Sequence, residues 1–127
     1  MNTPIRSYRD LVVWQKALEV IDSIDGIVEC FTSYQRWWLG IQMHRAALSV
    51  VSNIAEGHGA DYRQVYVRRL SDAKGSNTEL ETQLIVTGRR AYAPSDVIAS
   101  AFDLNAEVGR MLRGLSSKLR HPTRAQR

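Results

Sequence analysis

Four long segments of the chain carry apolar residues at the three- and four-residue spacing that is typical of amphipathic helices. This pattern predicts helices over about residues 11–31, 34–58, 62–91 and 96–120. Because the breaks between the segments are short, each helix must run back against the one before it. The sequence therefore predicts an all-α fold, an antiparallel up-down-up-down four-helix bundle, in a single domain that spans all 127 residues. The face of the first helix that we expect to be buried comprises Leu11, Trp14, Leu18, Ile21, Ile24, Val28 and Phe31.

Residues that favour helix starts lie before three of the segments. We expect Asp10 to cap the first helix. Thr32, with Gln35 three residues later, has the spacing of a capping box before the second helix. Asp61 and Gln64 repeat this spacing before the third helix.

Glycine and proline mark the helix ends. We interpret Gly57 and Gly59 as the C-cap of the second helix. The fourth helix begins after Pro94 and cannot continue through Pro122, which leaves residues 121–127 as a flexible tail.

The second helix has apolar or small residues around nearly its whole circumference: Ile41, Met43, Ala46, Ala47, Leu48, Val50, Val51, Ile54 and Ala55. A helix that is apolar on all sides must be buried on all sides, whereas a lone four-helix bundle leaves one side of each helix in water. The adjacent Trp37 and Trp38 project about 100° apart, so one core cannot hold both. We therefore expect a homo-oligomer with one of these tryptophans at the interface.

Two polar lines interrupt the apolar pattern, one on the second helix and one on the third. The first line comprises Gln42, Arg45, Ser49, Asn53 and Glu56, and the second comprises Arg69, Asp72, Ser76, Glu79 and Gln83. In an antiparallel hairpin these lines face each other, and they pair acid with base where Glu56 meets Arg69 and where Arg45 meets Glu79. Our hypothesis is a buried or half-buried ladder that fixes register and assembly. The alternative is a wet edge of the bundle, where ion pairs contribute about 0–1 kcal/mol.

The charge is distributed unevenly along the chain. The formal net charge is +4, and 14 of the 17 basic residues are arginine. Between Asp10 and Phe31 lie five acidic residues and one lysine, whereas six basic residues and no acid lie between Arg110 and Arg127. A basic surface for nucleic acid, complementary faces of packed helices, or a solvated C-terminus would each explain this asymmetry. The candidate nucleic-acid contacts are Arg63, Arg68, Arg110, Arg113, Lys118 and Arg120.

Candidate groups for catalysis are sparse. His44 and His58 lie about 21 Å apart along one helix, too far to share a metal, and His121 is in the tail. The single cysteine, Cys30, is expected to be packed among apolar neighbours and unreactive. We therefore predict neither an enzyme nor a metal or cofactor site. Since the sequence has no signal peptide and no apolar run of spanning length, we expect a cytoplasmic protein that does not bind membranes.

Three motifs carry a resemblance to a known family: Leu-x-x-Trp-x-Lys-Ala over residues 11–17, the polar line of the second helix continued through Ile-Ala-Glu-Gly to residue 57, and Gly-Ser-x-x-Glu-Leu-Glu-Thr-Gln-Leu over residues 75–84. Together they resemble the intervening-sequence proteins, which some bacteria encode within insertions in large-subunit ribosomal RNA genes. The resemblance implies a cytosolic four-helix bundle that assembles as a ring-like homopentamer and has no established enzymatic activity. The chain is also similar in architecture to the accessory variability proteins of diversity-generating retroelements, basic pentamers that bind nucleic acid and a reverse transcriptase.

The sequence departs from the family pattern in two places. The pair Trp37 and Trp38 stands where an aromatic-glycine or similar pair is more common, and Ala60 follows Gly59 where an arginine is common. The missing arginine weakens the expectation of a nucleic-acid contact at that turn. Two functions follow: a non-enzymatic homo-oligomer that binds RNA or DNA through basic surface residues, or a structural module that binds only protein.

Overall fold

The computed structural model describes residues 4–121 and shows four long helices. They are α1 (Val12–Glu29), α3 (Ile41–His58), α4 (Arg63–Arg89) and α5 (Ser95–Arg120). Three short elements accompany them: the 3₁₀ turn η1 (Tyr8–Asp10), the turn α2 (Ser33–Gln35) and the π-helical turn η2 (Arg36–Gly40). No strand occurs in these residues, so the all-α prediction is confirmed. Beyond His121, the predicted tail lies outside the described residues.

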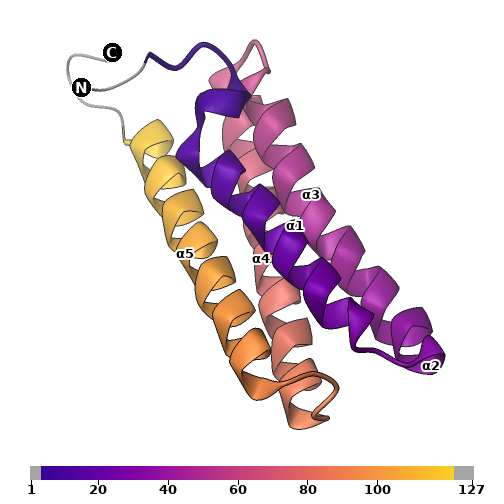
Figure 1. Ribbon diagram of the computed structural model, residues 1–127. Helices are drawn as coiled ribbons and strands as arrows, with labels where there is room; N and C mark the ends of the chain where they lie inside the picture. The colour runs from indigo at the N-terminus through magenta and orange to yellow at the C-terminus, as the bar shows by residue number, and fades with distance from the viewer. Residues whose placement is uncertain (1–3, 122–127) are drawn as a thin grey trace.

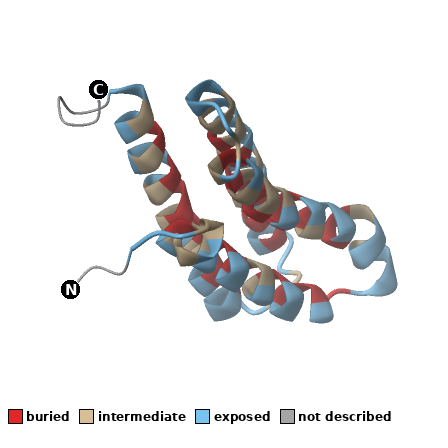
Figure 2. Cartoon of the chain, turned by 90° about the horizontal axis from the view of Figure 1, so that it is seen from above, coloured by how far each residue is buried: buried red, intermediate tan, exposed pale blue. Residues whose placement is uncertain are grey.

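The long helices enclose one core. In Figure 1, α3 packs against α4, α4 against α5, and α1 against both α3 and α5. Buried residues line the inward sides of the helices, and exposed residues face outward (Figure 2). No helix in the described part of the chain has the length and apolar character needed to cross a bilayer.

The buried face of α1 includes the predicted Ile24 and Val28 but differs from the prediction in the first half of the helix. Val13, Ala17 and Val20 are buried, whereas the predicted core residue Leu18 is exposed. Ala17 and Val20 pack among small side chains of α3 and α5, including Ala47. The inward side of α1 therefore carries the smaller side chains here, and the larger Leu18 faces outward.

The helix starts confirm one predicted cap and correct two. Thr32 and Gln35 form the expected capping box, with Gln35 N donating to Thr32 Oγ1 at 3.2 Å and Thr32 N donating to Gln35 Oε1 at 3.0 Å. Asp10 does not cap α1, because its carboxylate closes the preceding η1 turn and Leu11 occupies the N-cap position. Asp61 does not cap α4 either, since the N-cap is Tyr62, which makes no side-chain cap bond.

The glycines near the end of α3 have different roles. Gly59 is the C-cap, as predicted, but Gly57 lies inside α3 and is buried. A Cβ atom at Gly57 would stand 2.8 Å from Tyr66 Cδ1 and 2.9 Å from Arg69 Cβ. Gly57 therefore permits a close approach of α4, which is a packing role and not a capping role.

The segment predicted as one helix over residues 34–58 contains a π-helical turn, which places the two tryptophans in different environments. Trp38 is half-buried and packs edge-on against Tyr92 at a ring distance of 6.1 Å. Trp37 is 71% exposed, and Ile41 and Leu48 continue an exposed apolar stripe along the same outward side. In the single chain, part of the helix that the sequence predicts to be apolar on all sides is therefore exposed.

Candidate nucleic-acid interface

One end of the bundle gathers basic residues from three parts of the chain. The N-terminal segment, the α3–α4 turn and the C-terminal end of α5 all lie at the upper end of the molecule in Figure 1. Arg63, the first residue of α4, donates from Nε to the carbonyl oxygen of Leu119 on α5 at 2.6 Å. Lys118 lines a groove of about 290 Å³ together with Leu11 and Val12. We call this surface the basic end and define its cations as Arg6, Arg9, Arg63, Lys118 and Arg120.

The structure brings together only part of the predicted set. Arg63, Lys118 and Arg120 belong to the basic end, and all three are exposed. Arg110 lies ten residues before Arg120, about 15 Å away along the helix. Arg68 follows Arg63 by five residues and therefore points about 140° away from it around α4. The remaining candidate, Arg113, is exposed and shares a side of α5 with Arg120.

Sequence reasoning missed two cations and one aromatic residue at this end. Arg6 and Arg9 are exposed, and the Arg9 guanidinium lies 5.8 Å from the ring centre of Tyr8. Tyr62 is 71% exposed beside Arg63. Tyr62 could have been predicted from its place in the sequence, because it is an aromatic residue directly before an arginine in a turn. Two acids, Asp10 and Asp61, also lie here.

The carboxylate of Asp10 holds the turn of the N-terminal segment together. Its carboxylate accepts hydrogen bonds from the backbone N–H groups of Arg6 at 2.8 Å and Ser7 at 3.2 Å. These bonds, helped by the nearby charges of Arg6 and His58, lower the pKa of Asp10 below its ordinary value. Asp10 therefore stays ionised and holds the arginines of this segment in a fixed turn.

The two predicted polar lines face each other, but only two of the five pairs make contact. Ser76 Oγ donates to Ser49 Oγ at 2.8 Å, and Arg69 Nη1 lies 3.6 Å from Glu56 Oε2. The side chains of Arg69 and Glu56 are 40% and 57% exposed, so this ion pair lies at the wet edge of the bundle. The predicted register is therefore present, while the ion pair itself is not buried in the single chain.

The other three pairs are replaced by contacts within each helix. Asn53 Nδ2 donates to Ser49 Oγ at 3.1 Å and to the Ser49 carbonyl at 2.9 Å. Gln83 Nε2 donates to Glu79 Oε1 at 3.4 Å, and Gln42 donates to the carbonyl of Trp38 at 3.2 Å. Six members of the two lines have no partner on the facing helix: Gln42, Arg45, Asn53, Asp72, Glu79 and Gln83.

A buried polar pair that no sequence pattern predicted joins α4 to α5. Asn77 Nδ2 donates to the carbonyl and to Oδ1 of Asn105, both at 2.9 Å, and Asn105 Nδ2 returns a bond to the Asn77 carbonyl at 3.0 Å. Both side chains are buried. A Cβ atom at Gly109 would lie 2.6 Å from Asn77 Oδ1, so the glycine makes room for the pair.

Groups that could support chemistry do not converge in the described residues. No three His, Cys, Asp or Glu side chains in residues 4–121 are placed to hold a metal ion. His44 Nε2 lies 2.7 Å from Asp25 Oδ1, which joins α3 to α1 at the surface. Cys30 is exposed, so the prediction that it is packed was wrong. It follows the last residue of α1, where the chain turns outward.

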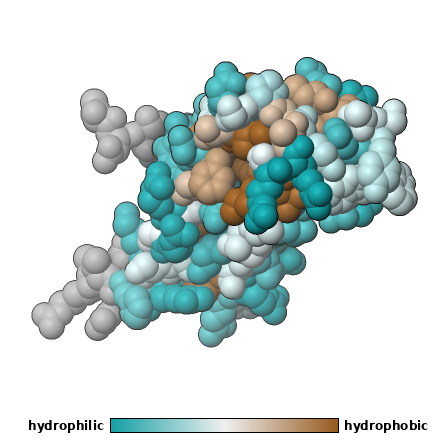
Figure 3. Space-filling view, turned by 90° about the horizontal axis from the view of Figure 1, so that it is seen from below, coloured by the Kyte–Doolittle hydropathy of each residue, from teal (hydrophilic) through white to brown (hydrophobic). Residues whose placement is uncertain are grey.

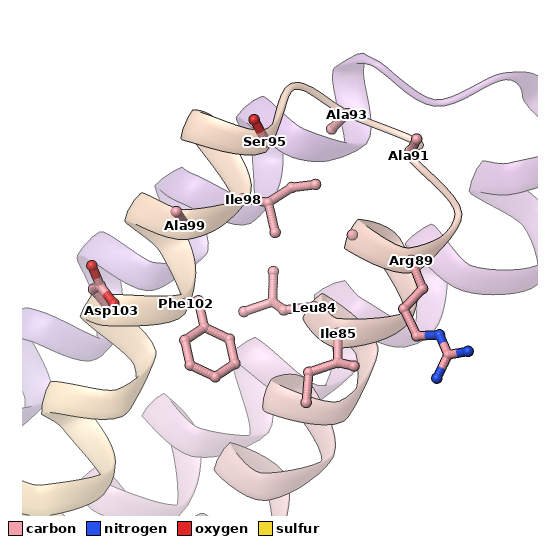
Figure 4. A pocket seen from close by; sticks show the side chains of 11 residues that line it. Leu84, Ile85, Arg89, Ala91, Ala93, Ser95, Ile98, Ala99, Phe102 and Asp103 are labelled. Carbon is pink, nitrogen blue, oxygen red and sulfur yellow. The ribbon is translucent and has the colours of Figure 1, made fainter.

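The opposite end of the bundle carries an apolar groove of about 530 Å³ between α4 and α5. Figure 4 shows Leu84, Ile98 and Phe102 pointing toward one another in this groove, while Arg89 extends away from it. Seen from below, brown apolar surface is gathered at the centre of this end and bordered by teal polar surface (Figure 3). The two ends of the molecule therefore differ in chemistry.

The family model described as 23S rRNA-intervening sequence protein matches residues 9–114. The chain belongs to this family. The match spans α1, α3 and α4, continues into α5 as far as Gly114, and confirms the resemblance drawn from the three motifs. It includes Arg9, Arg63 and Arg113, while Lys118 and Arg120 lie beyond it.

A solved structure shows the same fold. The crystal structure, at 1.70 Å resolution, of a protein with unknown function from the S23 ribosomal protein family of Bacteroides thetaiotaomicron matches with a TM-score of 0.77. The two sequences are 23% identical, and the match covers 83% of this chain and 98% of that one. Comparison with curated proteins finds no match.

Proposed function

We propose that the chain is a non-enzymatic homo-oligomer that binds RNA or DNA through its basic end. The observation that carries this proposal is the convergence of five cations from separate parts of the chain, tied together by the bond from Arg63 to the Leu119 carbonyl. Arginine forms paired hydrogen bonds with phosphate, and phosphate contacts supply affinity with little dependence on sequence. The family description, which refers to 23S rRNA, favours RNA over DNA.

Assembly is the second part of the proposal. The up-down-up-down bundle associates with further copies through the exposed apolar stripe of Trp37, Ile41 and Leu48, because exposed apolar side chains in a row are typical of interfaces. The family resemblance supports a ring of five copies. In such a ring, the basic ends of several copies would act together on one nucleic acid.

Salt dependence tests the binding proposal. We expect the affinity for a fluorescently labelled RNA of about 12 nucleotides to fall steeply between about 50 and 200 mM salt. Arg120→Gln should lower the slope of log affinity against log salt by about 1. The matched control is Arg90→Gln, an exposed arginine at the opposite end, which should leave the slope unchanged. An affinity that does not respond to salt, or an equal effect of the two variants, would contradict the proposal.

The apolar groove favours a second function, a module that binds protein. Ile85, on its rim, is 48% exposed, so Ile85→Arg should not disturb the fold. If the groove holds a protein partner, a partner captured from nuclease-treated lysate should be lost with Ile85→Arg and kept with Arg120→Gln. Capture that ends with nuclease treatment would instead favour nucleic acid.

A further inference from the structure

Tyr62 has a fixed backbone and a free ring. Its carbonyl oxygen accepts from the backbone N–H groups of Val65 at 3.1 Å and Tyr66 at 3.2 Å, which anchors the residue at the start of α4. Its side chain is 71% exposed and has no aromatic neighbour or hydrogen bond among residues 4–121. Nearby Tyr66 differs, because it is half-buried and packs edge-on against His58 at 5.8 Å. The fold therefore uses the ring of Tyr66 and leaves the ring of Tyr62 in water.

Cations from two helices lie close to Tyr62 in the fold. Arg63 follows Tyr62 directly, and its Nε bond to Leu119 brings the end of α5, with Lys118 and Arg120, next to the start of α4. Asp61, which precedes Tyr62, is one acidic residue beside these three cations, so the local charge still attracts phosphate. An exposed aromatic ring near several cations is the arrangement that binds single strands, in which a base stacks on the ring while the cations hold the backbone.

We propose that Tyr62 is a base-stacking platform that makes the basic end selective for single-stranded RNA, an inference that rests on the proposed function. An unpaired base can lie flat on an exposed ring, whereas the bases of a duplex are already stacked on one another. Arg63 and Arg120 contact the phosphates on either side of the stacked nucleotide. The ring supplies the preference for single strands, and the cations supply the dependence on salt.

The experiment compares a labelled single strand of about 12 adenylates with a duplex RNA of equal length in the same buffer. Tyr62→Ala should weaken binding of the single strand by about 5- to 150-fold, because stacking on one aromatic side chain contributes about 1–3 kcal/mol per base. Duplex affinity should stay unchanged. Tyr62→Phe should bind the single strand as the wild type does, since the ring remains.

Tyr34→Ala is the matched control, because Tyr34 is 68% exposed at the opposite end of the bundle. It should leave both affinities unchanged. Since both tyrosines are exposed, the variants should melt at the wild-type temperature, and this is checked first.

The outcomes separate this inference from the proposed function. If Tyr62→Ala binds the single strand like the wild type while Arg120→Gln weakens binding, the platform is wrong and the nucleic-acid function stands. If Tyr62→Ala weakens single strand and duplex equally, or Tyr62→Phe loses as much as Tyr62→Ala, stacking is also wrong. If the wild-type protein binds neither RNA, the proposed function fails and the platform fails with it.

Discussion

Two polar seams meet on α4, one with α3 and one with α5, and they differ in how much water reaches them. Against α3, the Ser49–Ser76 bond is half-buried and the Glu56–Arg69 pair is exposed. Against α5, the amides of Asn77 and Asn105 exchange three hydrogen bonds in a buried setting. The charged pair lies in the seam that water reaches, and the neutral amides lie in the seam from which water is excluded.

The difference shows why the two seams contribute unequally to stability. An exposed ion pair exchanges good hydration for a screened attraction and contributes about 0–1 kcal/mol. A neutral amide pair can satisfy its donors and acceptors internally, and removing one member leaves buried polar groups without partners. The α4–α5 seam should therefore be the more sensitive of the two.

The largest effect is expected from Asn105→Ala. This change removes two of the three bonds of the pair and leaves a small cavity, so the free energy of unfolding should fall by about 2–3 kcal/mol. Urea unfolding at one fixed protein concentration measures it, since assembly would shift the midpoint. Replacing both asparagines by leucine should cost less than the two single changes together. A loss below about 0.5 kcal/mol for Asn105→Ala would show that water enters the seam.

An intermediate effect is expected at the glycines that bring each neighbour close to α4. In Gly109→Ala the new Cβ would meet Asn77 Oδ1 at 2.6 Å, and in Gly57→Ala it would meet Tyr66 at 2.8 Å. Each should destabilise the fold by about 1–3 kcal/mol, because the helices must move apart. Gly114, which has no atom within 4 Å of an added Cβ, is the control, and Gly114→Ala should stabilise by about 0.5–1 kcal/mol. Equal melting temperatures for all three variants would contradict the close packing.

The smallest effect is expected for the ion pair of the α3–α4 seam. A double-mutant cycle of Glu56→Gln and Arg69→Gln should give a coupling energy of about 0–1 kcal/mol that shrinks as salt is added. A coupling of about 3 kcal/mol that does not respond to salt would mean that a neighbouring copy buries the pair, as the ladder hypothesis held.

The α3–α4 register could be predicted from the sequence because two independent patterns indicate the same pairing. The polar residues fall in line on each helix, and a short turn fixes which positions face each other, so the pairing of Ser49 with Ser76 could be read directly. Asn77 and Asn105 have no such signal. Each is an isolated amide among apolar positions. The turn between their helices includes Ala91 at φ 54°, a left-handed conformation that an alanine in the sequence does not predict.

The sequence predicted three of the five cations of the candidate interface but not the surface that they form. Arg63, Lys118 and Arg120 stand out as basic residues in the sequence. Their proximity depends on the bond between Arg63 and Leu119, which are 56 residues apart, and no local pattern reports such a contact. Arg110 stands out as a basic residue in the same way, but it lies too far from them along α5 to belong to the surface.

The π-helical turn η2 has a consequence for how this fold can vary. Such a turn holds one residue more than the same length of α-helix, so Arg36–Gly40 acts as a built-in insertion between the Thr32 cap and α3. Because the turn already absorbs the extra residue, deleting one residue there would restore an unbroken α-helix and leave the segments on either side in nearly their present orientation. The chain could thus lose one codon in this turn while the Thr32 cap and the rest of α3 keep their places.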